Sequence, residues 1–169
     1  MTRPETGRAW LLTAGLASSA MALFHLGIAV VGEPAYRRFG GSEFAERAAA
    51  GSWEPAIMLL TIAAVFALFA SYGFAGARIG PRPPFLRAGL IFVGLLYGVH
   101  GLFVVPELAA RLTHRPSGMP SNLGVDAIFL AMALPYVLGT VLAWPDLSRP
   151  SQKTLSTKDI KDDKDAKDN

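Results

Sequence analysis

The fold of this chain is decided by stretches such as WLLTAGLASSAMALFHLGIAVV, which covers Trp10–Val31 and contains no Asp, Glu, Lys or Arg. Three more apolar runs of similar length follow, at Pro55–Ala77, Phe85–Pro106 and Leu123–Trp144. An α-helix needs about 20 residues to cross the roughly 30 Å hydrocarbon core of a bilayer. A soluble domain of 169 residues has too little interior to bury four such runs. The sequence therefore predicts an all-α membrane protein, a four-helix transmembrane bundle.

The composition narrows the classes of function. Hydrophobic residues make up 51% of the chain and charged residues 17%, a balance too apolar for a disordered protein. The absence of cysteine excludes disulfides, iron–sulfur clusters, thiolate zinc sites and a cysteine nucleophile. The net charge of +3 does not indicate a nucleic-acid partner, because basic residues next to spans are typical of membrane topology and of contacts with anionic lipids.

The distribution of basic residues predicts the orientation. Eleven of the sixteen Lys and Arg residues lie in the N-terminal segment, the second loop and the C-terminal tail. The positive-inside rule then places both termini in the cytoplasm, and we expect the cell inner (plasma) membrane. Residues 1–150 form the predicted bundle. Residues 151–169 form a predicted disordered cytoplasmic tail, because Lys153–Asn169 carries five Lys and five Asp with almost nothing apolar.

Small residues and prolines predict how the spans pack. Ala14, Ser18 and Ala22 recur at every fourth position of the first span, and Gly94 and Gly98 do so in the third. Such faces let two helix backbones approach closely, so we expect spans one and three to touch. Pro135 should kink the fourth span. The first loop should carry a short helix from Glu43 to Ala50, with Ser42 as its N-cap.

Polar residues within the spans are candidates for a site, because hydrocarbon makes an unpaired polar group costly. His25 and His100 lie in spans that run in opposite directions, and the helical rise places each about 6–7 Å outward of the midpoint of its span. Tyr97, His100, Val104 and Glu107 share one helical face. The candidate ligand-binding residues, all expected in the outer half of the bundle, are His25, Glu33, Glu54, Tyr97, His100, Glu107 and Asp126.

Three interpretations of the two histidines remain open. Each imidazole could form only structural hydrogen bonds with a neighbouring helix or a buried water. His25 and His100 could instead ligate zinc, copper or iron together with a carboxylate, or hold a haem axially. A third interpretation is a proton path or acid–base site, because histidine and glutamate titrate near neutral pH when buried together.

A resemblance supports the membrane assignment. The stretches His25-Leu-Gly-Ile-Ala, Glu33-Pro-Ala-Tyr-Arg-Arg-Phe-Gly and Ala50-Gly-Ser-Trp-Glu-Pro-Ala resemble small four-span proteins of the bacterial inner membrane, over roughly the first two-thirds of the chain. The resemblance implies four helices in that membrane and no particular activity or cofactor. In architecture alone, the chain is also similar to four-span folds that bind sterol-like ligands in a central pocket.

Three classes of function follow from these observations. The first is a binding or accessory subunit, with a metal, haem or small lipophilic ligand near His25 and His100. The second is an enzyme that carries out acid–base chemistry on a lipophilic substrate. The third is a structural subunit of a larger membrane complex. The expected partners are the lipid bilayer and either other membrane subunits or a second copy of the chain, and no nucleic acid.

Overall fold

The computed structural model of the protein describes residues 2–114 and 122–148. Its long helices are α1 (Arg3–Val31), α4 (Glu54–Gly76), α5 (Leu86–Gly101) and α7 (Leu123–Ala143), and α6 (Val104–Thr113) extends α5. With α5 and α6 taken together, these are four helical segments long and apolar enough to cross a membrane. No strand occurs in residues 2–114 and 122–148. The predicted all-α, four-helix membrane fold is confirmed, whereas the predicted tail, residues 151–169, lies outside the described residues.

Two of the spans differ from the sequence prediction at their ends. The first helix begins at Arg3 rather than Trp10, and the Thr2 N–H donates a 2.8 Å hydrogen bond to the Glu5 carboxylate. This bond satisfies a donor at the helix start. In the third span, the helix breaks at Leu102 and Phe103 before α6 begins. The break follows from Pro106, which has no N–H for the Leu102 carbonyl and clashes with it.

Short helices form a cap over the ends of α1 and α4. The segments α2 (Glu33–Ala35), a π-helical turn (Tyr36–Gly40) and α3 (Ser42–Ala49) follow each other directly. Their apolar residues pack on Ile28 of α1 in a small separate core. The predicted helix in this loop is confirmed. Its N-cap is Gly41 rather than Ser42, because the backbone there adopts a φ of 90°, which glycine tolerates.

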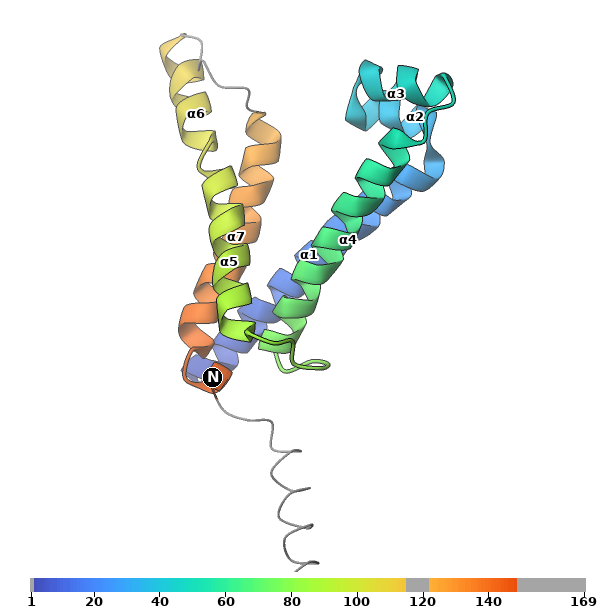
Figure 1. Cartoon of the computed structure of the whole chain (residues 1–169). Coiled ribbons are helices and arrows are strands. Elements are labelled where there is room, and N and C mark those ends of the chain that lie inside the picture. The colour runs from blue at the N-terminus through green and yellow to red at the C-terminus, as the bar shows by residue number, and fades with distance from the viewer. Residues whose placement is uncertain (1, 115–121, 149–169) are drawn as a thin grey trace, which may run out of the picture.

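The spans are arranged as two arms (Figure 1). The first arm is the pair α1 and α4, and the second arm is the pair α5 and α7. The arms cross near the start of α1 and the end of α7, which we call the closed end, and they diverge toward α3 and α6, the open end. The described chain begins at the closed end, and α7 also finishes there. The two ends of the bundle therefore lie on the same side of the membrane.

Glycines allow the close approach of backbones near the closed end. A Cβ on Gly73 of α4 would lie 2.6 Å from the backbone nitrogen of Gly15, and one on Gly139 of α7 would lie 2.7 Å from the Leu11 side chain. The small residues of α1 therefore face α4 and α7. Spans one and three touch, as predicted, through Ser18 of the small-residue face and Tyr97. The glycines of span three do not make this contact, because Gly94 faces Tyr136 and Val137 of α7, and a Cβ on Gly98 would meet nothing within 4 Å.

Candidate functional site

Three hydroxyl groups meet where the arms begin to separate. Ser18 Oγ of α1 lies 3.2 Å from the hydroxyl of Tyr97 of α5 and 3.0 Å from that of Tyr136 of α7. The Tyr136 hydroxyl also donates a 2.7 Å hydrogen bond to the Phe69 carbonyl of α4. All four spans thus contribute to one buried polar network. This network provides the contact between spans one and three that their glycines do not make.

Aromatic rings form the next layer outward. The aromatic layer consists of Phe66 of α4, Tyr97 of α5 and Phe129 of α7. Their ring centroids lie 6.1 Å apart for Phe66 and Tyr97, 6.4 Å for Phe66 and Phe129, and 5.6 Å for Tyr97 and Phe129. These distances suit aromatic packing, and the layer joins the two arms. Outward of it, the aromatic contacts of the described residues stay within one arm.

His25 lies on the first arm, beside the aromatic layer. Its ring stacks on Phe66 with a centroid separation of 5.2 Å. Its Nδ1 lies 2.8 Å from the Met21 carbonyl of the same helix, and because a carbonyl can only accept, Nδ1 carries the proton. In the neutral imidazole, Nε2 is then a hydrogen-bond acceptor. His25 therefore offers an acceptor near the level where the arms part.

His100 lies on the second arm, against the same layer. Its ring centroid is 4.1 Å from that of Phe129. Its Nε2 is 3.8 Å from Oδ1 of Asp126, which is beyond hydrogen-bond distance but close enough for attraction if the imidazole is protonated. The His100 side chain is 47% exposed and that of Asp126 only 4%. The other carboxylate oxygen, Oδ2, is buried and has no hydrogen-bond partner.

The structure divides the predicted site residues between the arms. His25 and His100 contact different rings of the aromatic layer and do not stack on each other. Glu33 pairs with Arg37 at 2.6 Å and Glu54 with Arg47 at 3.1 Å, both in the cap of the first arm. Glu107 pairs with Arg111 at 3.2 Å on α6. Among residues 2–114 and 122–148, no three His, Asp or Glu side chains converge as a metal site would require.

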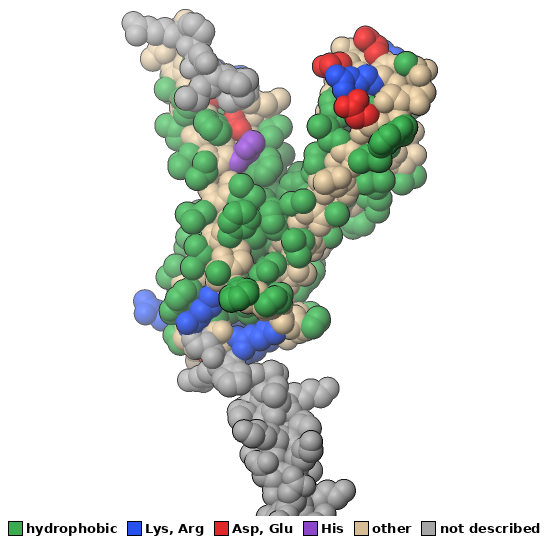
Figure 2. Space-filling view, in the orientation of Figure 1, with side chains coloured by type: hydrophobic (Ala, Val, Ile, Leu, Met, Phe, Trp, Pro, Cys, Tyr) green, Lys and Arg blue, Asp and Glu red, His purple; other side chains and the backbone are tan. Residues whose placement is uncertain are grey.

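An opening separates the arms outward of the aromatic layer. Figure 2 shows hydrophobic side chains along both arms and a histidine beside an acidic side chain on the arm that carries α6. We call this opening the cleft. His25 on one arm and the half-exposed His100 on the other pack against the aromatic layer beside it, and the buried Asp126 carboxylate lies 3.8 Å from His100 Nε2.

Sequence reasoning missed several residues that build this region. Phe66 and Phe129 were not identified, because phenylalanine in a span is ordinarily a lipid-facing or packing residue. Ser18 was assigned only to a small-residue face, and Tyr136 was not considered. A usable signal was that both Tyr97 and Tyr136 carry a hydroxyl deep in a span, where it needs a partner.

Comparisons of the chain with protein-family models, with curated proteins and with solved structures give no match.

Proposed function

We propose that this integral membrane protein binds a small lipophilic ligand in the cleft between its two arms. The ligand carries at least one hydrogen-bond donor, which reaches Asp126. We further propose that the protein lies in the cell inner membrane with both termini in the cytoplasm, as its basic residues favour. The cleft then opens toward the outer leaflet.

The buried oxygen of Asp126 is the observation that carries this proposal. A carboxylate inside a spanning helix is costly, and such residues are functional candidates because they face a cavity or a partner. Asp126 is buried, its Oδ2 has no partner, and its neighbour His100 is too distant for a hydrogen bond. Buried polar atoms are nearly always paired, so an unpaired one indicates an absent ligand group or water.

The neighbours of Asp126 indicate the class of ligand. The aromatic layer and the apolar sides of the arms suit a hydrophobic body. Both the Asp126 carboxylate and His25 Nε2 accept hydrogen bonds, so the ligand must carry a hydrogen-bond donor. An alcohol or an amine on an apolar skeleton meets this requirement. A metal centre has less support, because no three His, Asp or Glu side chains among residues 2–114 and 122–148 form a group of ligands.

Photolabelling with a matched pair of probes tests the proposal. One probe is a long-chain alcohol with a diazirine in its chain, and the other is its methyl ether, which cannot donate. We expect the alcohol to label the protein about tenfold more efficiently, because a hydrogen bond to a charged group contributes roughly 1.5–3 kcal/mol. The labelled peptides should include Phe66 or Phe129.

Two variants complete the experiment. Asp126→Leu should abolish the preference for the alcohol, whereas Glu107→Gln should retain it, because Glu107 is paired with Arg111 on α6. Equal labelling by alcohol and ether in the unmodified protein would contradict the proposal. So would a preference that survives Asp126→Leu.

An acid–base enzyme is the second candidate, and the His100–Asp126 pair favours it. The Asp126 carboxylate, 3.8 Å from His100 Nε2, would stabilise the charged imidazolium that forms when a general base accepts a proton. In this alternative, His100 moves a proton on a lipophilic substrate bound in the same cleft. His100→Gln would then abolish turnover while retaining the labelling by the alcohol probe.

We also propose partners for the surface of the bundle. The lipid bilayer is the direct partner of the apolar helix faces. A larger membrane complex or a second copy of the chain is the expected protein partner, and no nucleic acid is expected.

A further inference from the structure

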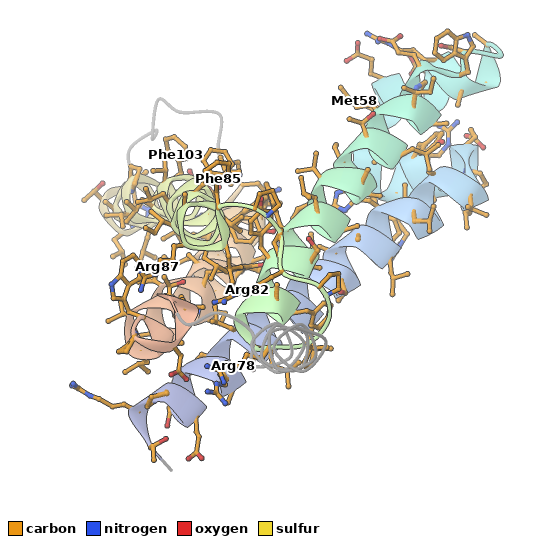
Figure 3. The ribbon with its side chains drawn as sticks, turned by 60° about the horizontal axis from the view of Figure 1, so that its bottom comes forward. Met58, Arg78, Arg82, Phe85, Arg87 and Phe103 are labelled. Atoms are coloured by element: carbon orange, nitrogen blue, oxygen red, sulfur yellow. The ribbon has the colours of Figure 1, made fainter. Side chains whose placement is uncertain are left out.

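Arginines gather at the closed end, on the opposite side of the molecule from the cleft. Arg8 comes from α1, and Arg78, Arg82 and Arg87 come from the loop between α4 and α5 and from the first turn of α5. Figure 2 shows basic side chains clustered at this end, and Figure 3 shows Arg78 near the start of α1, Arg87 near the end of α7 and Arg82 between them. We call these four residues the basic rim.

The closed end carries an excess of positive charge. Among the described residues there, Arg3 and the basic rim face only two carboxylates, Glu5 and Asp146. Asp146 is shared, because Arg8 pairs with it and Arg78 approaches it at 3.6 Å. One carboxylate cannot neutralise two guanidinium groups. The remaining charge lies at the level where a bilayer presents its phosphates.

Contacts with the end of α7 hold the rim in place. Arg87 stacks over the Trp144 ring, with its Cζ 4.3 Å from the centroid, and donates a 2.8 Å hydrogen bond to the Trp144 carbonyl. Arg82 donates to the Leu147 carbonyl in the short turn Asp146–Ser148. Each of these bonds uses one of the five N–H groups of a guanidinium. Side chains fixed in this way lose little further entropy when they bind an anion.

Two residues of the same loop adopt a backbone conformation that L-amino acids rarely use. Arg78 has a φ of 66° and Phe85 a φ of 54°. Such a conformation is unfavourable for a residue with a Cβ atom. Phe85 is the N-cap of α5, and the residue is 84% exposed. The turn therefore leaves an aromatic ring uncovered next to the basic rim.

We propose that the closed end binds the headgroup of an anionic phospholipid. The phosphate binds at the basic rim, and Phe85 contacts the lipid at the level of its glycerol and upper acyl chains. Arginine suits this role, because its planar fork matches the oxygens of a phosphate. The site is independent of the cleft, which opens at the other end of the bundle.

Native mass spectrometry of the full-length protein in detergent tests this site. We add phosphatidylglycerol, phosphatidylcholine or inorganic phosphate and measure the fraction of protein that retains each one. We expect phosphatidylglycerol to be retained in preference to the other two. The double variant Arg78→Gln/Arg87→Gln should lower its retention roughly thirtyfold, because each basic residue near an anionic lipid contributes about 1 kcal/mol.

The control variant is Arg37→Gln/Arg38→Gln, which removes the same charge at the open end and should retain phosphatidylglycerol. Arg78→Lys/Arg87→Lys keeps the charge and should recover part of the binding, whereas a merely misfolded variant would not. Thermal unfolding of each variant identifies any loss of fold. The proposal is overturned if phosphatidylcholine is retained equally well, if inorganic phosphate binds as tightly as the lipid, or if the control loses as much as the rim variant.

Discussion

Ser18 shows how one small polar residue can order a membrane bundle. Its hydroxyl is fully buried and contacts both Tyr97 and Tyr136, while Tyr136 also donates to the Phe69 carbonyl. Hydrogen bonds between transmembrane helices contribute about 0.6 kcal/mol on average and up to about 1.7 kcal/mol. We expect the contribution of Ser18 to lie in the upper part of this range, because its hydroxyl has two partners from two different helices.

We therefore predict that Ser18→Ala lowers the free energy of unfolding in detergent by about 1–2 kcal/mol. The change removes one hydroxyl and leaves the Tyr97 hydroxyl without this partner. Unfolding measured by circular dichroism in a denaturing detergent checks the value. Ser71→Ala is the matched control, because the Ser71 hydroxyl is exposed and bonds only the Leu68 carbonyl of its own helix. An equal loss in the two variants would contradict a role for the network.

Coupling within the network gives a second prediction at this scale. Ser18→Ala and Tyr136→Phe should not be additive, because Ser18 and Tyr136 share a hydrogen bond of 3.0 Å. Residues in one network typically deviate from additivity by 0.5–3 kcal/mol. Unfolding of the two single variants and the double variant measures the coupling. A double variant that equals the sum of the singles would mean that the two hydroxyls act independently.

At the scale of the elements, sequence predicted the spans and missed their pairing. Length and apolar composition suffice to identify four spans, and the ends of α4 and α7 were predicted within a residue. The pairing depends on which face of each helix meets a neighbour. Lipid-facing and buried positions are both apolar in a bilayer, so no polar face distinguishes them. The Gly94 and Gly98 pattern thus predicted a contact that Gly73 and Gly15 make instead.

The site was predicted in part for the same reason. His100 and Asp126 were identified because polar residues in spans are rare, and the structure brings them together. Sequence could not show that the break caused by Pro106 interrupts the face shared by Tyr97, His100 and Glu107. It also could not show that the histidines belong to different arms, because this depends on the angle at which α1 crosses α7.

Substitution of glycines tests the pairing. We predict that Gly73→Ala destabilises the protein by more than about 2 kcal/mol, because its Cβ would lie 2.6 Å from the backbone of Gly15 and α1 would have to move. Gly98→Ala is the control and should be neutral or stabilising by up to about 1 kcal/mol, since its Cβ meets nothing within 4 Å and alanine favours the helix. Denaturant unfolding compares the two. The reverse order would mean that Gly98 faces a helix, as the sequence pattern suggested.

At the scale of the whole molecule, the absence of cysteine makes topology accessible to labelling. We predict that a cysteine at Ile79, in the loop of the closed end, reacts with a membrane-impermeant maleimide only after the cells are opened. A cysteine at Ser42, in the cap of the first arm, should react in intact cells. The reason is the excess of arginine at the closed end. The opposite result would place the cleft in the cytoplasmic leaflet.

The two ends of the molecule should also differ in rigidity. The closed end is held by backbone contacts, the hydroxyl network and the ion pairs of Asp146. At the open end, outward of the aromatic layer, no aromatic contact joins the described parts of the two arms. Segments with few mutual contacts open at low free energy. We therefore predict that spin labels at Met58 and Val125, one on each arm near the open end, give a broad distance distribution in electron paramagnetic resonance. Labels at Thr13 and Val141, near the closed end, should give a narrow one.

Ligand binding should then narrow the distribution at the open end. A ligand that contacts both arms favours the arrangements in which their distance fits it, and it does so by its difference in affinity between them. Addition of dodecanol is expected to sharpen the distances between Met58 and Val125 and to leave those between Thr13 and Val141 unchanged. Asp126→Leu should remove the narrowing caused by dodecanol, because the carboxylate binds the alcohol. The distance distribution before addition should stay as broad as in the unmodified protein, because its width comes from the divergence of the arms. Equal widths at the two ends, before any addition, would mean that the cleft is a rigid feature of the fold.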